Sequence, residues 1–195
     1  MSNQFRFSII LASASPRRKQ LLAEVGYRFT TITPDIDESA YPTGGHNACE
    51  YAKMLALAKA KSVAVKHPDC LVIGADTVVD FDGEIIGKPA DAKDAERITK
   101  KIFSKPHKVI TGLAVVRLSD GIEVVESDTT IVYPKKMTAE QIAEHIKGGS
   151  WRDKAGAYAI QESGDEFVEK IEGSLTNVMG LPMELLQQLL KKFVG

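Results

Sequence analysis

The chain has 195 residues, 44% of them hydrophobic, and a formal net charge of −1 at pH 7, so it can bury a sizeable core as one domain or as two lobes. The near-zero charge argues against general nucleic-acid binding, because there is no basic excess to neutralise a phosphate backbone. The sequence contains neither an apolar stretch of membrane-spanning length nor a signal-peptide core, so we expect no membrane partner and a cytoplasmic location.

Strand-like and helix-like segments alternate along the chain, which is typical of an α/β fold. The expected strands span residues 7–12, 29–32, 70–79, 84–86, 107–118, 122–133 and 166–172. The expected helices span residues 16–25, 47–66, 91–103 and 138–147, with a last amphipathic helix after Pro182. Asp82 and Gly83 predict a tight turn between two strands, and the Gly- and Ala-rich residues 153–161 predict irregular backbone. Neither a linker nor an internal repeat is visible, so we expect one domain over residues 1–195.

The most informative segment is Leu-Ala-Ser-Ala-Ser-Pro-Arg-Arg-Lys at residues 11–19. Its Ser-Pro pair places an N-cap and a first-turn proline together, which predicts a helix start. Arg17, Arg18 and Lys19 then bring three positive charges into the first turn, where the helix dipole is already positive, at roughly 0.3–1 kcal/mol each. Either these side chains extend into water or a bound phosphate compensates them. Charge alone does not separate the two interpretations.

A carboxylate interrupts the apolar run at residues 71–79, Leu-Val-Ile-Gly-Ala-Asp-Thr-Val-Val. Burying Asp76 is costly unless a cation, a metal or hydrogen bonds compensate its charge. The alternatives are an edge-strand Asp that faces solvent and an Asp in a bend after Gly74. Because Thr77 and two valines continue the strand, we favour a functional role for Asp76.

A second acidic group follows the expected strand at residues 29–32. By themselves, Asp35, Asp37 and Glu38 indicate a solvated loop. Beside Asp76, however, Glu38 becomes a candidate for a Mg²⁺ site, because this ion is typically held by one or two carboxylates plus substrate phosphates.

Two lysines lie in loops of small residues, Lys88 in Gly-Lys-Pro and Lys154 in Asp-Lys-Ala-Gly. Lysines in such loops are commonly only exposed, but we assign Lys88 to the candidate catalytic set and Lys154 to the substrate-binding set. Fixed cations, two acids and no evident nucleophile–base pair describe metal-assisted phosphoryl chemistry better than acyl transfer.

The cysteines and histidines carry little functional signal. Cys49 and Cys70 are widely spaced, so neither a disulfide framework nor a zinc site is readable, and a reducing compartment fits best. The histidines show no ligand spacing, and we expect each at the surface: His46, His67, His107 and His145.

Short segments between residue 9 and about residue 190 form a recognisable series. They are residues 11–18 (Leu-Ala-Ser-Ala-Ser-Pro-Arg-Arg), 74–79 (Gly-Ala-Asp-Thr-Val-Val), 87–89 (Gly-Lys-Pro), 111–112 (Thr-Gly), 153–158 (Asp-Lys-Ala-Gly-Ala-Tyr), Ile160 with Gln161, and Asn177 with 180–182 (Gly-Leu-Pro). In composition, order and approximate spacing this series resembles the Maf family of nucleoside triphosphate pyrophosphatases, and the resemblance covers essentially the whole chain.

The resemblance implies an elongated, mixed α/β fold of the Maf and inosine triphosphatase type, with a twisted sheet flanked by helices, two lobes and a central cleft. It also implies a homodimer. The implied reaction is hydrolysis of a nucleoside triphosphate to the monophosphate and pyrophosphate, with Mg²⁺ or Mn²⁺ as cofactor. Asp76 takes the position of the general base near the metal, and Glu38 would help to hold the ion. The residues that would bind the triphosphate and stabilise charge as the α–β bond breaks are Ser13, Arg18, Lys59 and Lys88.

Three positions resemble the branch of the family that acts on dTTP and UTP: Arg17, Thr77 and Gln161. A glutamine amide offers one donor and one acceptor, which match the N3–H donor and O4 acceptor of thymine or uracil; alone, Gln161 would be taken for an exposed strand-end residue. The branch that acts on 7-methyl-GTP commonly has Trp after Ser-Pro and Glu in place of this Gln.

The chain departs from the family pattern at a few positions. Ala159 stands where the family usually has Gly, which would cost about 1–2 kcal/mol if that backbone needs a positive φ. Residues 103–107 and 150–152 also differ. Trp151 could cap the base pocket, but a packing or dimer contact is the expected role.

Two alternatives stay open beside a pyrophosphatase for dTTP, UTP and modified pyrimidine nucleotides. One is a nucleotide-binding regulator of cell division without significant turnover, and the other is a pyrophosphatase for another base, such as 7-methyl-GTP. Asp76 and Glu38 favour an enzyme over a pure binder, because two acids facing a triphosphate would repel it without a metal.

Overall fold

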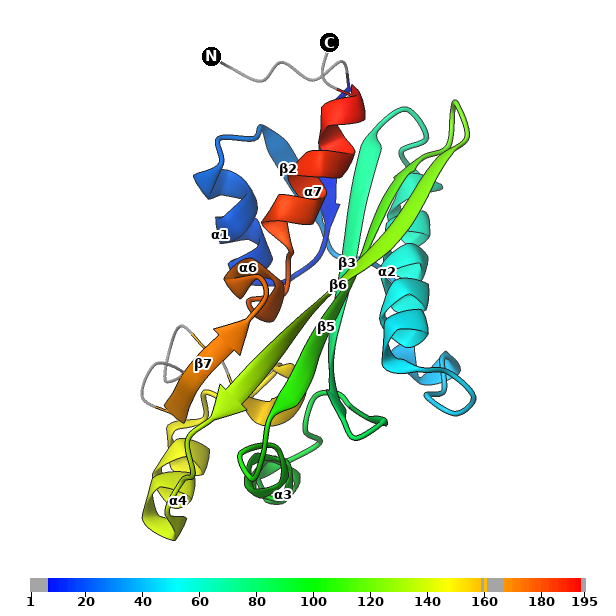
Figure 1. The fold of residues 1–195 in the computed structure, drawn as a ribbon. Coiled ribbons are helices and arrows are strands. Elements are labelled where there is room, and N and C mark those ends of the chain that lie inside the picture. The colour runs from blue at the N-terminus through cyan, green and yellow to red at the C-terminus, as the bar shows by residue number, and fades with distance from the viewer. Residues whose placement is uncertain (1–6, 159, 161–166, 194–195) are drawn as a thin grey trace.

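The computed structural model describes residues 7–158, 160 and 167–193. Within this part of the chain, seven strands form one twisted sheet with helices on both faces, and the molecule is elongated along the sheet (Figure 1). The mixed α/β class and the elongated sheet expected from the sequence are confirmed. The strands are β1 (Ile9–Ala12), β2 (Phe29–Ile32), β3 (Leu71–Phe81), β4 (Glu84–Ile86), β5 (His107–Arg117), β6 (Ile122–Pro134) and β7 (Val168–Glu172), in the order β2-β1-β3-β5-β6-β7, with β4 also paired to β3.

One edge of β3 is only partly paired. β1 runs parallel to β3 and pairs with it from Ile9 to Ala12, which lies opposite Gly74. β4 pairs antiparallel with the same edge, beginning at Val79. The other edge of β3 pairs continuously with β5. Residues 75–78 therefore have a neighbouring strand on one side only, and the sheet has an opening beside them.

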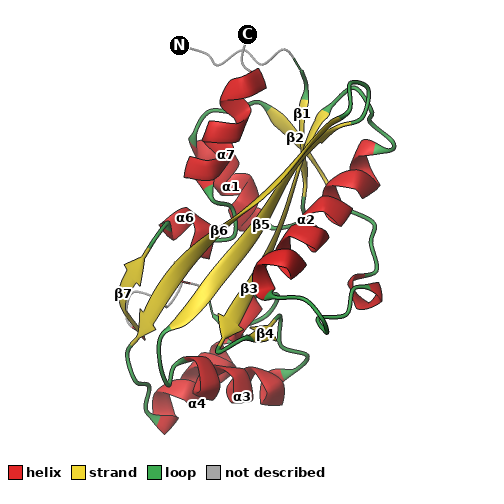
Figure 2. Ribbon diagram, turned by 45° about the vertical axis from the view of Figure 1, so that its right-hand side comes forward, coloured by secondary structure: helices red, strands yellow, loops and turns green. Residues whose placement is uncertain are grey.

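The helices cover both faces and one end of the sheet. They are α1 (Pro16–Glu24), α2 (Ala48–Ala64), α3 (Ala92–Ile102), α4 (Ala139–Gly148), α6 (Leu175–Val178) and α7 (Met183–Leu190), with short 3-10 turns η1 (Glu38–Ala40), η2 (Ala155–Ala157) and η4 (Lys191–Phe193). α2 runs along one face, α1 and α7 lie against the other, and α3 and α4 pack at the far end (Figure 2). Alternation along β3 explains this, because its odd-numbered residues from 71 to 75 join the core under α1 and α7 while Val72 joins the core under α2.

α2 lies unusually close to the sheet. A Cβ on Gly74 would come within 2.3 Å of the carbonyl oxygen of Ala56, and a Cβ on Gly112 within 2.2 Å of that of Ala52. The helix begins with a capping box between Asn47 and Glu50, which satisfies backbone donors at its first turn. Glycine on the strands and alanine on the helix thus allow the close approach that brings the next turns of α2 against β3.

The expected strands and helices are confirmed, with ends displaced by at most two residues. β3 continues to Phe81, and the tight turn after it has positive φ at both Asp82 (53°) and Gly83 (84°), as a type I′ hairpin turn requires. Residues 153–158 are irregular as expected. The short elements η1 and α6 were not predicted, because they contain too few residues to show a periodic pattern.

The prediction that every histidine lies at the surface is wrong for His107 and His145, which are 3% and 8% exposed. Each one is buried because backbone and side-chain groups satisfy its ring nitrogens, as described below. The expected packing role of Trp151 is confirmed, since this side chain is buried and its indole N–H donates to the carbonyl oxygen of Ile146 at 2.9 Å.

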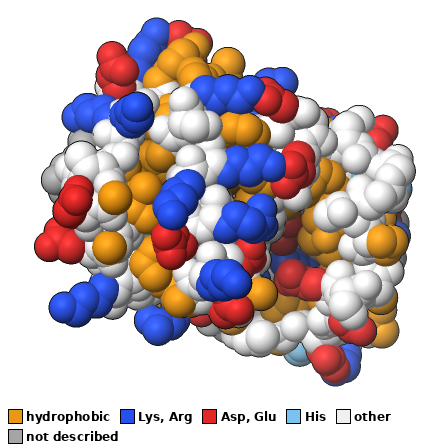
Figure 3. Space-filling view, turned by 90° about the horizontal axis from the view of Figure 1, so that it is seen from below, with side chains coloured by type: hydrophobic (Ala, Val, Ile, Leu, Met, Phe, Trp, Pro, Cys, Tyr) orange, Lys and Arg blue, Asp and Glu red, His pale blue; other side chains and the backbone are white. Residues whose placement is uncertain are grey.

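Charged side chains of both signs are interspersed over the end of the molecule that carries α3 and α4 (Figure 3). On α3, Arg97 pairs with Asp94 and Lys100 pairs with Glu96. Such exposed pairs contribute little to stability. In the described part of the chain, none of the helices combines the length and the apolar character needed to cross a membrane.

Candidate active site

A pocket of about 650 Å³ lies at the opening beside β3, where β1 ends and α1 begins. Strands, helices and loops from the whole length of the chain contribute to it. Of the site residues expected from the sequence, those that line this pocket are Ser13, Arg17, Arg18, Glu38, Lys59, Asp76, Thr77, Lys88 and Lys154. Gln161, the expected base-reading residue, lies outside the described residues, as does Ala159. The central cleft expected from the sequence is thus present, and it brings these residues together.

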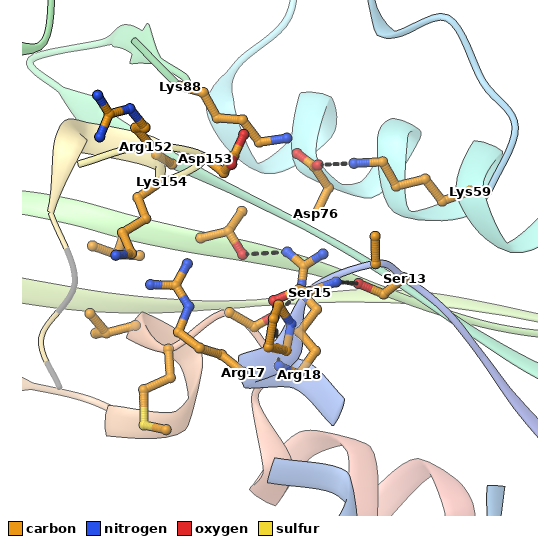
Figure 4. Close-up of a pocket in the computed structure, with 18 of the residues that line it drawn as sticks. Ser13, Ser15, Arg17, Arg18, Lys59, Asp76, Lys88, Arg152, Asp153 and Lys154 are labelled. Carbon is orange, nitrogen blue, oxygen red and sulfur yellow. Dashed lines mark hydrogen bonds and ion pairs between the residues drawn. The ribbon is translucent and has the colours of Figure 1, made fainter. Parts of the chain in front are cut away.

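Asp76 is buried in the middle of β3, and a lysine from α2 compensates its charge. Nζ of Lys59 lies 2.5 Å from Oδ1 of Asp76, and the two residues are each 6% exposed (Figure 4). The expectation that a buried Asp76 needs a compensating partner is confirmed, and the alternative of a solvent-facing edge residue is wrong. The compensating cation is Lys59 because β3 directs the Asp76 side chain toward the face of the sheet that α2 covers.

The same ammonium group also holds Glu38, at 2.8 Å from Oε1. Glu38 begins η1, whose N-cap is Asp37 and whose first turn is closed by the Asp37 carboxylate accepting from the backbone N–H of Ser39 at 3.0 Å. Partial burial opposes ionisation of Glu38, but the hydrogen bond and charge of Lys59, with the charges of Lys88 and Arg18, outweigh it and lower the pKa of the Glu38 carboxyl. Glu38 is therefore a carboxylate at neutral pH.

Arg18 is held from the other face of β3. Its Nε donates to the carbonyl oxygen of Gly180 at 2.6 Å, and its terminal nitrogen donates to Oγ1 of Thr77 at 3.0 Å. The Thr111 hydroxyl donates to the carbonyl oxygen of Asn177 at 3.0 Å, so Thr77 must be the donor in its 2.9 Å contact with Thr111. Arg18 therefore donates to Thr77, Thr77 to Thr111, and Thr111 to the backbone. These hydrogen bonds fix the guanidinium at the wall of the pocket.

The three positive charges at the start of α1 have different surroundings. Burial lowers the pKa of Arg18, and the nearby Asp76 charge partly offsets this effect; an arginine nevertheless stays protonated. Protein acceptors, and not only water or a phosphate, therefore stabilise Arg18. Arg17 lines the pocket and lies on the same side of it as Lys154 (Figure 4), while Lys19 is exposed.

The pocket also has apolar lining residues, which were not assigned from the sequence. The apolar lining consists of Val109, Tyr158, Ile160, Val178 and Met179, together with small residues. Arg152 and Asp153 also line the pocket and were not assigned, although Asp153 directly precedes Lys154. Two of the apolar residues, Tyr158 and Ile160, lie in segments that carried the family resemblance, so that signal could have placed them. Cationic, acidic and apolar groups thus line the same cavity.

The donor set fits a hard divalent cation. Among the described residues, no group of three or more His, Cys, Asp or Glu side chains is arranged to hold a metal. Asp76 and Glu38 nevertheless direct one oxygen each at a single cation, the Lys59 ammonium. Two carboxylate oxygens with the remaining positions left to water and phosphate oxygens are the usual protein contribution to a Mg²⁺ site. Asp76 and Glu38 are therefore the residues that could hold Mg²⁺ or Mn²⁺.

Comparison with solved structures supports the fold. The Ham1 protein of Staphylococcus aureus is 15% identical, with a TM-score of 0.54 over 95% of this chain and 98% of that chain. A HAM1 protein from Coxiella burnetii is 12% identical, with a TM-score of 0.51 over 95% and 99%. At these identities the likeness concerns the fold alone.

Sequence comparison is more specific. A protein of Citrifermentans bemidjiense named dTTP/UTP pyrophosphatase is 46% identical over 176 residues, which cover 90% of each chain. A protein of the same name from Symbiobacterium thermophilum is 40% identical over 185 residues, covering 95% of this chain and 93% of its own. The family model described as Maf-like protein matches residues 8–193. The pocket residues and these matches together identify the chain as a member of the Maf family.

Proposed function

We propose that this protein is a nucleoside triphosphate pyrophosphatase that hydrolyses dTTP and UTP to the monophosphate and pyrophosphate. One observation carries the proposal: Asp76 and Glu38 share the cation Lys59 in a pocket that Arg17, Arg18 and Lys88 also line. Acidic and basic groups arranged in this way suit a polyanionic substrate that is cleaved by water. The relatives named dTTP/UTP pyrophosphatase support the assignment of the substrate.

The triphosphate would bind at the start of α1. Pro16 and Arg17 open this helix, and the backbone N–H groups of its first turn, with the positive end of the helix dipole, favour an anion. Arg18 presents a guanidinium fixed by two acceptors, so little side-chain entropy is lost when phosphate arrives. Lys88, from the Gly-Lys-Pro loop, would balance the charge that develops on the leaving pyrophosphate.

Asp76 is our candidate for the general base. It would accept a proton from the attacking water as the α–β phosphoanhydride bond breaks and the bonding electrons leave with pyrophosphate. Lys59, 2.5 Å from Oδ1 of Asp76, would orient the carboxylate. When bound, Mg²⁺ or Mn²⁺ held by Asp76 and Glu38 would supply Lewis-acid neutralisation of phosphate charge.

The nucleoside would contact the apolar lining of the pocket, where Tyr158, Ile160 and Met179 offer contact area. We propose that Gln161 reads the base through its amide donor and acceptor. Thr77 is committed to Arg18 and Thr111, so we propose that it acts on the substrate by fixing Arg18 and not by touching the base.

Three further expectations accompany this function. The family resemblance supports a homodimer and one functional unit over residues 1–195. Cys49 and Cys70 are free thiols, which suits a reducing compartment such as the cytoplasm. We therefore propose a homodimer, one functional unit over residues 1–195 and a cytoplasmic location.

The test is pyrophosphate release with Mg²⁺ or Mn²⁺ across a panel of canonical and modified nucleoside triphosphates. Wild type should turn over dTTP and UTP, and Asp76→Asn should lose about 10²–10⁴-fold in rate while it stays folded. Glu126→Gln, an exposed carboxylate on β6, is the matched control and should keep full activity. Turnover of 7-methyl-GTP alone would refute the base assignment, and nucleotide binding without any turnover would favour a regulator instead.

A further inference from the structure

Residues 153–158 form one wall of the pocket and have an unusual backbone. Asp153 has φ of 59°, Gly156 of 69° and Ala157 of 61°. Residues with a Cβ adopt this left-handed region at an energetic cost, and such conformations persist only where surrounding contacts impose them. The contacts that impose them here therefore control the shape of this wall.

His107 holds one end of the wall. Its Nδ1 lies 3.1 Å from the carbonyl oxygen of Ile102, and its Nε2 lies 3.0 Å from the hydroxyl of Tyr158. A carbonyl can only accept, so Nδ1 carries the proton, Nε2 accepts, and the Tyr158 hydroxyl donates. Burial lowers the pKa of His107 to about 4, so this neutral tautomer persists at neutral pH.

His145 holds the adjacent residue. From α4, its Nε2 donates to the carbonyl oxygen of Ala157 at 2.7 Å, and its Nδ1 lies 3.4 Å from the hydroxyl of Ser150. Two buried histidines from different elements, β5 and α4, thus hold two consecutive residues of the wall. The left-handed Ala157 carries one of these attachment points and directly precedes the other.

The wall connects both parts of the proposed substrate site. Lys154 and Tyr158 line the pocket directly. The backbone N–H of Gly156 donates to the carbonyl oxygen of Gly87 at 3.1 Å, and Gly87 precedes Lys88. The ring of Tyr158 also packs edge-on against Phe103, with 5.4 Å between centroids. The position of the Tyr158 side chain is therefore set by Phe103 and His107 and not by residues that line the pocket.

We propose that His107 and His145 are positioning residues that hold this wall in the shape that recognises the nucleoside part of the substrate. The inference rests on the proposed function, because it takes the apolar lining of the pocket as the nucleoside subsite. It predicts that altering either histidine weakens binding of the nucleoside while the phosphate-binding groups at the start of α1, which other elements hold, remain in place.

Two replacements of His107 separate its two hydrogen bonds. Gln can place an acceptor near the position of Nε2 and so keep the Tyr158 contact, whereas Asn reaches only the position of Nδ1 and keeps the Ile102 contact. We expect His107→Asn to raise KM for dTTP and UTP about tenfold or more with kcat changed less than about threefold, and His107→Gln to restore wild-type KM.

The same logic applies to His145, where Gln reaches the position of Nε2 and Asn does not. His145→Asn should raise KM, and His145→Gln should restore it. His46→Asn, at an exposed histidine, is the control. A second readout uses binding of inorganic triphosphate, which lacks a nucleoside: its affinity should be unchanged in every variant that is folded by circular dichroism and thermal unfolding.

The outcomes distinguish the two proposals. If wild type releases no pyrophosphate from any nucleotide, the proposed function fails. If wild type turns over dTTP and UTP but His107→Asn and His145→Asn leave KM unchanged, only the positioning role fails. Equal losses for nucleotide and inorganic triphosphate binding, or no rescue by the Gln variants, would also overturn it, because the histidines would then maintain the fold in general.

Discussion

Asp76 and Thr77 are neighbours in β3, yet they are held from opposite faces of the sheet. Lys59 of α2 contacts Asp76, and Arg18 of α1 contacts Thr77. Alternation along a strand sends consecutive side chains to opposite faces, which would ordinarily separate them. Because β1 ends at Ala12, the edge of β3 is open at this point, and both residues line one pocket.

Loss of the Lys59 ammonium should destabilise the protein. Lys59→Met leaves the carboxylates of Asp76 and Glu38 facing each other, and breaking a buried ion pair by removing one partner costs as much as roughly 3–5 kcal/mol. Urea denaturation measures the change. Lys61→Met, which removes an exposed lysine paired with Glu123, should change the unfolding free energy by less than about 0.5 kcal/mol.

Two additions sharpen this prediction. Asp76→Asn should recover part of the loss in the Lys59→Met background, because it removes one of the two like charges. Mg²⁺ should raise the Tm of Lys59→Met more than that of wild type, since a bound cation replaces the missing ammonium and stabilises the folded state by mass action. Identical metal-induced shifts in the two proteins would argue against Asp76 and Glu38 as metal ligands.

Arg18→Lys should reduce kcat/KM despite the conserved charge. The guanidinium donates to Gly180 and Thr77 at once, and a lysine ammonium lacks the planar fork needed to span two such acceptors. We expect a loss of about ten- to a hundredfold, equivalent to roughly 1.4–2.7 kcal/mol of transition-state stabilisation. Steady-state kinetics with dTTP measure it. Arg97→Lys, at an exposed i,i+3 pair with Asp94, should remain at wild-type activity; a similar loss there would contradict the explanation.

Gly74→Ala should disrupt the contact between α2 and β3. The added Cβ would lie 2.3 Å from the carbonyl oxygen of Ala56 and 2.8 Å from the backbone nitrogen of Ala60, and backbone atoms cannot rotate away. Overpacking of this kind costs roughly 3 kcal/mol or more. Gly44→Ala is the matched control, because within the described part of the chain nothing lies within 4 Å of the added Cβ. Equal unfolding free energies for the two variants would show that α2 can move away freely.

Stability should fall as the pH decreases from about 6.5 toward 4. Burial lowers the pKa of His107 from 6.5 to about 4. Above pH 6.5 the ring is neutral in both states and the full stability is present; below it, the unfolded chain binds a proton that the folded chain does not. The unfolding free energy should therefore decrease by at most roughly 3 kcal/mol over this range.

Denaturation curves at several pH values measure this contribution. His107→Gln does not titrate, so its stability should decrease less steeply between pH 6.5 and 4 than that of wild type. His46→Gln removes an exposed histidine and should leave the slope unchanged. If the unfolding free energy of His107→Gln decreased as steeply with pH as that of wild type, other groups would cause the pH dependence.

Local rules were sufficient to predict much of the fold. The start of α1 follows from Ser15 and Pro16, because an N-cap acceptor and a fixed proline φ act within one turn. The hairpin turn at Asp82 and Gly83 follows from the same kind of short-range preference. The strands of the sheet were predicted because buried apolar runs can be seen in the sequence alone. The short η1 and α6 were missed because neither contains enough residues to show a period.

Most of the candidate site residues were also predicted, but their partners were not. The sequence by itself marked Asp76 as a carboxylate that needs compensation, and marked Arg18 as a charge in an unfavourable place. Only the tertiary structure decided that Lys59 compensates the first and that Gly180, 162 positions away, accepts from the second. It also buried His107 and His145, whose spacing carries no local signal. Hydrogen bonds and ion pairs depend on distances of a few ångströms, and for residues far apart in the chain these distances are set by strand lengths, sheet register and helix packing.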